Sequence, residues 1–113
     1  MKNSTSTVNI NCCSIFSKAI ASEQAQDIAA IFKVLGEPAR LQLLSFIASQ
    51  PDREACGCDL IEPLGLAQPT VSHHLKVLYQ AGLLDKERRG KWIYYLINKK
   101  KFAMLQEVLA IDK

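Results

Sequence analysis

The chain has 113 residues, of which 49% are hydrophobic and 22% charged, and its net charge is +3. A domain this small buries little apolar core alone, so we expect a homo-oligomer. The N-terminus has no apolar run that could serve as a signal peptide and no stretch approaches a membrane span, so we expect a cytoplasmic protein.

Charge is distributed unevenly along the chain. Residues 1–65 carry five Lys/Arg against seven Asp/Glu, whereas residues 66–113 carry nine against four. Seven of the fourteen basic residues lie between Lys86 and Lys101. A basic second half favours a polyanionic partner such as double-stranded DNA.

The first third of the chain is predicted to be an arm followed by helices. Residues 1–11, rich in Ser, Thr and Asn, are expected to form a flexible arm, and residues 12–113 a single domain. The apolar stretch 15–20 is predicted as a first helix. Ser22 is a good N-cap for the next helix, which Gly36 ends. The buried positions of that second helix are predicted to be Ile28, Ile31, Phe32 and Leu35.

A further helix is predicted to start at Pro38, because proline suits the first helical turn. It should end near Ser49, ahead of Pro51. Its buried stripe is predicted to be Leu41, Leu44, Ile47 and Ala48. Residues 52–54 then form a charged loop.

The middle of the chain has the order of a helix-turn-helix. Asp59 is predicted to cap a short helix that Gly65 closes, and Pro63 should keep that helix short. Leu66–Gln68 reads as a turn, and Pro69 begins the next helix. A short helix, a tight turn and a longer helix make up this motif.

The longer helix has two distinct faces. Val71, Leu75 and Leu78 fall at i, i+4 and i+7, which predicts one buried stripe. Hydrogen-bonding side chains lie largely off this stripe: Thr70, Ser72, His73, Lys76 and Tyr79. An amphipathic surface helix would have the same pattern, but the flanking chain favours a helix that reads base edges in a major groove.

The last third predicts a β-hairpin and a closing helix. Residues 83–88 and 91–97 read as two strands, and Gly90 between them indicates a turn. Arg88, Arg89 and Lys91 lie at the predicted tip. Residues 99–110 form a helix with Phe102, Leu105 and Leu109 on one face. The predicted fold is therefore mainly α (α+β): a winged helix-turn-helix with a two-stranded β-hairpin wing.

Three stretches resemble the arsenic-responsive repressor family (ArsR/SmtB): Leu35–Leu41, Gln68–Lys76 and Ala81–Leu83. The resemblance covers roughly residues 25–97. It implies a cytosolic homodimer that binds operator DNA and releases it when a toxic metal or metalloid binds. The implied major-groove residues are Gln68, Thr70, Ser72, His73, His74 and Lys76. The implied wing contacts to phosphate or minor groove are Arg88, Arg89 and Lys91.

One position departs from the family pattern. Ala67 stands where relatives often carry a Ser that caps the major-groove helix. Losing that cap costs about 1 kcal/mol and should not abolish DNA binding.

The resemblance also implies how two chains would associate. The N- and C-terminal helices, with Ile15, Phe16 and Ile20 and with Phe102, Leu105 and Leu109, are the expected dimer interface. A two-fold dimer predicts a roughly palindromic operator with half-sites about one helical turn apart.

Four cysteines occur as two pairs, Cys12-Cys13 and Cys56-x-Cys58. In the cytosol we expect thiols, and thiolates select soft, thiophilic ions. A site shared by both pairs requires the arm to fold over the start of the short helix, within one chain or across a dimer. Residues two apart on a helix point to nearly opposite sides, so at least Cys56 must lie in the turn ahead of Asp59 for the close pair to share an ion.

The Cys56–Leu60 stretch resembles the site of the family's arsenite and cadmium/lead sensors. The Cys12-Cys13 pair resembles that of members that complete a three-thiolate arsenite site between subunits. The first choice of As(III) ligands is Cys12, Cys13 and Cys56, with Cys58 as an optional fourth or exchange ligand. Sb(III), Cd(II) and Pb(II) are further candidate inducers, and no organic cofactor is expected. Residues 99–113 contain no His, which excludes the family's usual zinc site on the last helix.

Several alternatives remain open at this point. The cysteines could be ordinary small apolar residues, or a thiol redox switch that forms disulfides. His73 and His74 could bind metal, although adjacent histidines on such a helix more often contact DNA or pack. An enzyme is not expected, because the sequence has neither a nucleophile-base-acid constellation nor a Gly-rich phosphate loop. A winged helix that binds protein instead of DNA is disfavoured by the basic wing.

Overall fold

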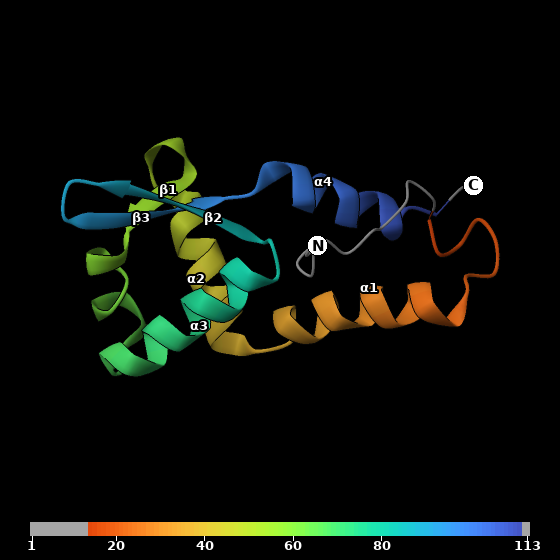
Figure 1. The fold of residues 1–113 in the computed structure, drawn as a ribbon, viewed down its shortest axis with the longest axis horizontal. Coiled ribbons are helices and arrows are strands. Elements are labelled where there is room, and N and C mark those ends of the chain that lie inside the picture. Colours follow the sequence, from red (N-terminus) through yellow and green to blue (C-terminus); the bar gives the residue numbers. More distant parts are fainter. Residues whose placement is uncertain (1–13, 112–113) are drawn as a thin grey trace.

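The computed structural model describes residues 14–111. Four α-helices are present: α1 (Ser22–Leu35), α2 (Pro38–Ser49), α3 (Gln68–Gln80) and α4 (Lys99–Val108). Three strands form one sheet: β1 (Glu54–Cys56), β2 (Leu84–Arg89) and β3 (Trp92–Ile97). Short 3-10 turns span Pro51–Arg53, Gly57–Asp59 and Glu62–Leu64. Figure 1 shows the hairpin and the terminal helices α1 and α4 pointing to opposite ends of the molecule.

The predicted helix over 15–20 is wrong, since residues 14–21 form turns. The Ser17 hydroxyl donates to the Ser14 carbonyl at 2.8 Å, and such local side-chain bonds compete with helix formation. The Ile15 amide donates to the carbonyl of Val108 at 3.0 Å. This segment therefore runs beside the end of α4. The predicted Ser22 cap is also wrong, because Ala21 is the N-cap and makes no side-chain cap.

The bounds of α2 match the prediction. The Glu37 carboxylate accepts a hydrogen bond from the Ala39 amide at 2.7 Å and caps the helix, with Pro38 in its first turn. The buried residues of α2 are Leu43, Leu44 and Ile47. The prediction that Leu41 is buried is wrong, because it is 51% exposed. The core-facing side of α2 is centred on Leu43, where α3 and the sheet cover it.

The sheet has the order β1-β3-β2, and both pairings are antiparallel. The hairpin of β2 and β3 is confirmed, with Gly90 at φ 64° in its turn, a backbone angle that favours glycine. Residue Glu54, expected in a loop, instead opens β1. Three residues are too few to show an alternating pattern in the sequence.

The short helix predicted to start at Asp59 does not form. Two 3-10 turns replace it, and Gly65 at φ 66° closes the second. Cys56, rather than Asp59, is the N-cap of the first turn, and its Sγ accepts from the Cys58 amide at 3.2 Å. Pro63 lies inside the second turn, where its missing N–H works against a longer helix.

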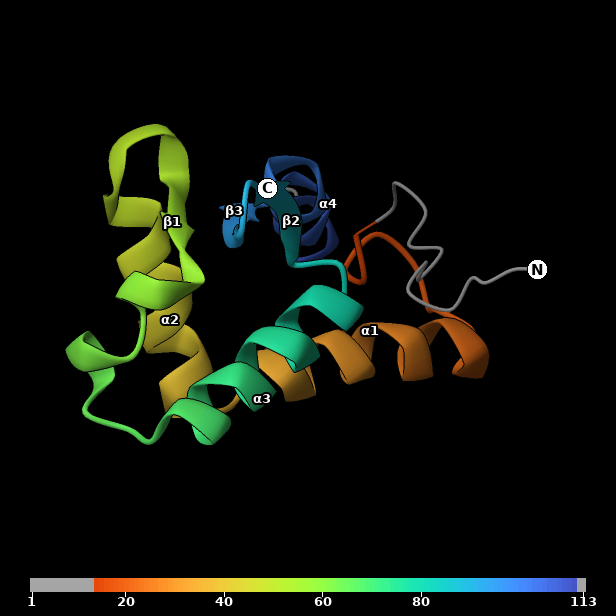
Figure 2. The same ribbon diagram turned by 60° about the vertical axis from the view of Figure 1, so that its left-hand side comes forward.

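Helix α3 contributes its apolar side to the core. The predicted buried stripe is confirmed, because Val71, Leu75 and Leu78 are all buried. Figure 2 shows α3 on the lower side of the molecule, with the strands and α4 above it.

The molecule is more extended than a compact domain of its length. Its radius of gyration is 15.2 Å, whereas a compact domain of this length has about 13 Å. The excess reflects α1 and α4, which project beyond the sheet (Figure 1). Within residues 14–111, no helix is long and apolar enough to cross a bilayer.

Two leucines on α2 test this packing. Replacing the fully buried Leu43 with Ala should lower the free energy of unfolding by about 2–5 kcal/mol, because it removes apolar contacts and leaves a cavity. Leu41→Ala is the matched control and should cost under about 0.5 kcal/mol. Urea unfolding at one protein concentration measures both, and equal losses would contradict the assigned face of α2.

Candidate DNA-binding surface and thiol pair

The outer face of α3 carries most of the residues predicted to read DNA. Gln68, Thr70, Ser72, His73 and Lys76 are all exposed. The helical period explains their exposure: a helix that buries Val71, Leu75 and Leu78 turns its opposite side to solvent. The helix N-cap is Ala67, which makes no side-chain cap, as the sequence indicated.

His74 differs from its neighbours, because only 12% of its side chain is exposed. Its Nδ1 lies 3.2 Å from Arg40 Nη1, and its Nε2 lies 4.0 Å from a Glu37 carboxylate oxygen. Arg40 Nε also donates to the Val34 carbonyl at 2.7 Å. The Arg40 guanidinium therefore joins α3 to the end of α1 and the start of α2. The structure thus directs His74 toward the protein body.

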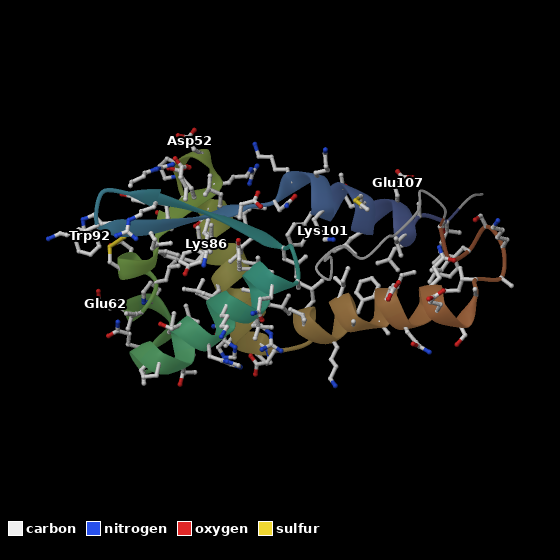
Figure 3. The ribbon with its side chains drawn as sticks, viewed as in Figure 1. Asp52, Glu62, Lys86, Trp92, Lys101 and Glu107 are labelled. Atoms are coloured by element: carbon white, nitrogen blue, oxygen red, sulfur yellow. A yellow bond between two sulfur atoms is a disulfide. The ribbon has the colours of Figure 1, made fainter. Side chains whose placement is uncertain are left out.

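The wing presents two exposed cations near its tip. Arg88 Nε donates to the Gly90 carbonyl at 3.1 Å, and Lys91 Nζ lies 5.2 Å from the centre of the Trp92 ring. Trp92 itself is 48% exposed, and Figure 3 shows it at the hairpin end of the molecule. Both cations are therefore available to a phosphate backbone.

Arg89, the third predicted wing contact, is already paired. It donates two hydrogen bonds to the Glu54 carboxylate, one at 2.9 Å, and lies 3.2 Å from Glu87. Its guanidinium also stacks on the Tyr94 ring at 4.3 Å. Hydrogen bonding to Arg89 lowers the pKa of Glu54, against a smaller opposing effect of desolvation, and the same contacts raise the pKa of Arg89. Its positive charge is thus largely compensated.

The close cysteine pair lies at the end of β1. Cys56 is buried with 4% exposed and Cys58 is exposed, and the structure joins their sulfur atoms in a disulfide. The expectation of free thiols is therefore not met for this pair. The sequence indicated that the two sulfurs can meet only if Cys56 lies in a turn ahead of Asp59; in the structure Cys56 ends β1 and is the N-cap of the turn Gly57–Asp59. Cys12 and Cys13 lie outside the described residues.

Other metal sites are not evident in the part of the chain that the structure describes. Among residues 14–111, no three His, Cys, Asp or Glu side chains are grouped closely enough to hold an ion. A three-thiolate site with Cys56 and Cys58 would therefore require a ligand from outside this range.

Comparison with known proteins identifies the family. Residues 37–86 match the bacterial regulatory protein, arsR family. An arsenical resistance operon repressor of Staphylococcus xylosus is 36% identical over 73 residues, which cover 65% of this chain and 67% of that protein. The chain belongs to the arsR family.

Two solved structures agree with this assignment. The antimony-specific transcriptional repressor AntR is 31% identical and matches with a TM-score of 0.65 over 79% of each chain. A homodimeric winged helix-turn-helix domain from Mycobacterium bovis is 27% identical, with a TM-score of 0.61 over 79% of this chain and 86% of that one. The winged-helix fold and the family resemblance predicted from the sequence are confirmed.

The geometry distinguishes the exposed side chains of α3, which are predicted to contact DNA, from the largely buried His74 of the same helix. Lys76→Ala should reduce the slope of log affinity against log salt by about one per subunit, because it removes one cation from the surface predicted to displace counterions from DNA. His74→Ala should weaken binding roughly tenfold with the slope unchanged, because it loses contacts within the protein, to Arg40 and Glu37, and none to phosphate. Fluorescence anisotropy at four salt concentrations measures both. A changed slope in His74→Ala would mean that this imidazole contacts the DNA backbone.

Proposed function

We propose that this arsR-family protein is a transcriptional repressor that releases its operator when trivalent arsenic binds its cysteine thiolates. The observation that carries the proposal is the meeting of Cys56 and Cys58 at the end of β1, next to the wing. The names of the arsenical resistance and antimony-specific relatives support it. The proposed role is regulatory rather than enzymatic, and we propose a cytoplasmic location, where thiols are kept reduced and operator DNA is accessible.

The proposed ligands are Cys12, Cys13 and Cys56, with Cys58 as a fourth or exchange ligand. Arsenous acid exchanges its three hydroxyl groups for the sulfurs of three cysteine thiols, and each hydroxyl leaves as water with one thiol proton, so no oxidant or reductant is consumed. Binding requires the reduced form of Cys56 and Cys58. The Cα atoms of Cys56 and Cys58 lie 5.1 Å apart, so the two reduced side chains can reach the same ion from this backbone.

The proposed DNA contacts fall into two groups. The exposed face of α3 enters the major groove, and its members are Gln68, Thr70, Ser72, His73 and Lys76. The exposed wing cations Arg88 and Lys91 meet phosphate or minor groove. His74 and Arg89, also predicted at this surface, serve to position the other groups through Arg40 and Glu54.

We propose a homodimer built on the end of the molecule where α1 and α4 project. Phe16 (55%), Leu109 (48%) and Ile111 (70%) expose large apolar side chains there. The Ser14 hydroxyl donates to the Ala110 carbonyl, which holds the segment before α1 against the end of α4. These side chains form an apolar surface that a second copy would cover. The homodimeric relative supports this arrangement.

The central test is release of promoter DNA from the reduced protein. Arsenite at about one per subunit should lower operator affinity, and Cys56→Ser should abolish the effect, because As(III) then lacks a thiolate. Anisotropy of labelled promoter DNA measures the affinity. Cys12→Ser and Cys13→Ser should act like Cys56→Ser, while Cys58→Ser should retain most of the response. Insensitivity of the wild-type protein to arsenite would refute this inducer.

Cadmium and lead are the alternative inducers, since both accept three or four thiolates. They predict a different outcome in the same titration. Cadmium or lead would release the DNA while arsenite would not, and Cys58→Ser would be as damaging as Cys56→Ser because four ligands are then needed.

The disulfide of Cys56 and Cys58 favours a second candidate function, a thiol redox switch. Hydrogen peroxide would take two electrons and two protons from the two thiols and become two water molecules. This function predicts that peroxide in metal-free buffer releases the operator and that dithiothreitol restores binding. Unchanged DNA affinity after peroxide treatment would exclude it.

The dimer surface can be tested with one charge. Leu109→Asp should shift the protein from dimer to monomer in analytical ultracentrifugation, because a carboxylate cannot be buried in an apolar interface without a large cost. Leu41→Asp is the matched control, since that leucine is equally exposed, at 51%, on another helix. Dissociation in both variants, or in neither, would contradict an interface at α1 and α4.

A further inference from the structure

Strand β1 brings the thiol pair and the wing into one sheet. Cys56 lies opposite Tyr94, and Glu54 lies opposite Leu96, on the central strand β3. Glu87 of β2 lies opposite the same Tyr94 from the other side. Because directly paired residues share a face of the sheet, Cys56, Tyr94 and Glu87 form one row across three strands.

Glu54 belongs to the same face, since it lies two residues before Cys56. Its carboxylate accepts both hydrogen bonds from Arg89 at the tip end of the wing, and only 18% of its side chain is exposed. Arg89 in turn covers the Tyr94 ring at 4.3 Å. A single chain of contacts therefore runs from the Cys56 strand to the wing tip.

The backbone after Cys56 is also packed on the wing. A Cβ added at Gly57 would lie 3.2 Å from the Tyr95 ring and 3.6 Å from the Ile93 carbonyl. By contrast, residues 59–67, which include the short turn Glu62–Leu64, separate Cys58 from the start of α3. The wing is thus the DNA-contacting element that the thiol pair touches directly.

We propose that Glu54 is a positioning residue that couples ligation at Cys56 and Cys58 to the placement of the wing. The proposal rests on the function proposed above. β1 has three residues, so a change in the backbone around Cys56 displaces Glu54 two positions away. Displacing Glu54 removes the bidentate partner of Arg89, and the wing then loses the geometry that presents Arg88 and Lys91 to phosphate.

Glu87 supplies a matched control. It also pairs with Arg89, at 3.2 Å, but it lies on β2 within the hairpin itself. Glu54→Gln and Glu87→Gln each remove one negative charge beside Arg89, so their direct electrostatic effects on DNA affinity should be alike. Only Glu54→Gln breaks the connection between β1 and the wing.

The experiment measures operator affinity of the reduced full-length protein with and without saturating arsenite. The ratio of the two dissociation constants is the coupling between the sites. Glu54→Gln should reduce this ratio at least fivefold, and Glu87→Gln should leave it within twofold of wild type. Arsenite affinity of the DNA-free protein, followed by competition with a dithiol, should be unchanged in both variants. A purely structural role for Glu54 would alter that affinity as well.

A second variant tests the route through Arg89. Arg89→Gln should lose coupling to the same extent, and Glu54→Gln added to Arg89→Gln should cause no further loss. Coupling that persists in Glu54→Gln, or that falls equally in Glu87→Gln, would overturn this proposal while leaving the repressor function intact. A wild-type protein whose DNA affinity ignores arsenite would instead overturn both.

Discussion

Burial of one side of α3 is the constraint on which the DNA-binding surface depends. Val71, Leu75 and Leu78 are at most 3% exposed, and they fix the rotation of the helix about its axis. That rotation alone decides which side chains point outward. The contact between Arg40 and His74 then ties the same helix to the start of α2. Apolar packing sets the orientation of α3, and this polar contact further restricts the range of orientations that the helix can adopt.

The sequence was sufficient to predict the elements that have many residues and a clear period. α2 has its predicted bounds, and α3 begins at Gln68, one residue before the predicted Pro69, because proline and the apolar spacing agree in both helices. Prediction failed where elements are short. β1 has three residues, and the segment after it forms 3-10 turns, so neither contains a full period. Leu41 was assigned to the wrong face because hydrophobicity alone does not show which leucines a neighbouring sheet covers.

The sequence predicted which residues belong to the candidate site better than it predicted which of them contact one another. The exposed residues of α3 followed from the helical period, and the basic wing followed from its charge. Pairings such as Arg89 with Glu54 join residues 35 positions apart, and His74 with Arg40 join residues 34 apart. The local spacing of residues does not predict such contacts, because they depend on how the helices and strands pack together. A count of basic residues therefore overstated the free positive charge of the wing, since Arg89 is neutralised by two carboxylates.

The contacts that position α3 and the wing lie near opposite ends of helix α2. Glu37, at the start of α2, lies near the imidazole of His74 on α3. At the other end of α2, the chain passes through one short turn into Glu54, which holds the wing through Arg89. A protein that contacts the groove with α3 and the flanking phosphates with the wing needs both elements at a fixed separation. A shift of β1 relative to α2 changes that separation without unfolding either element, so DNA affinity can fall steeply while the core of the protein stays intact.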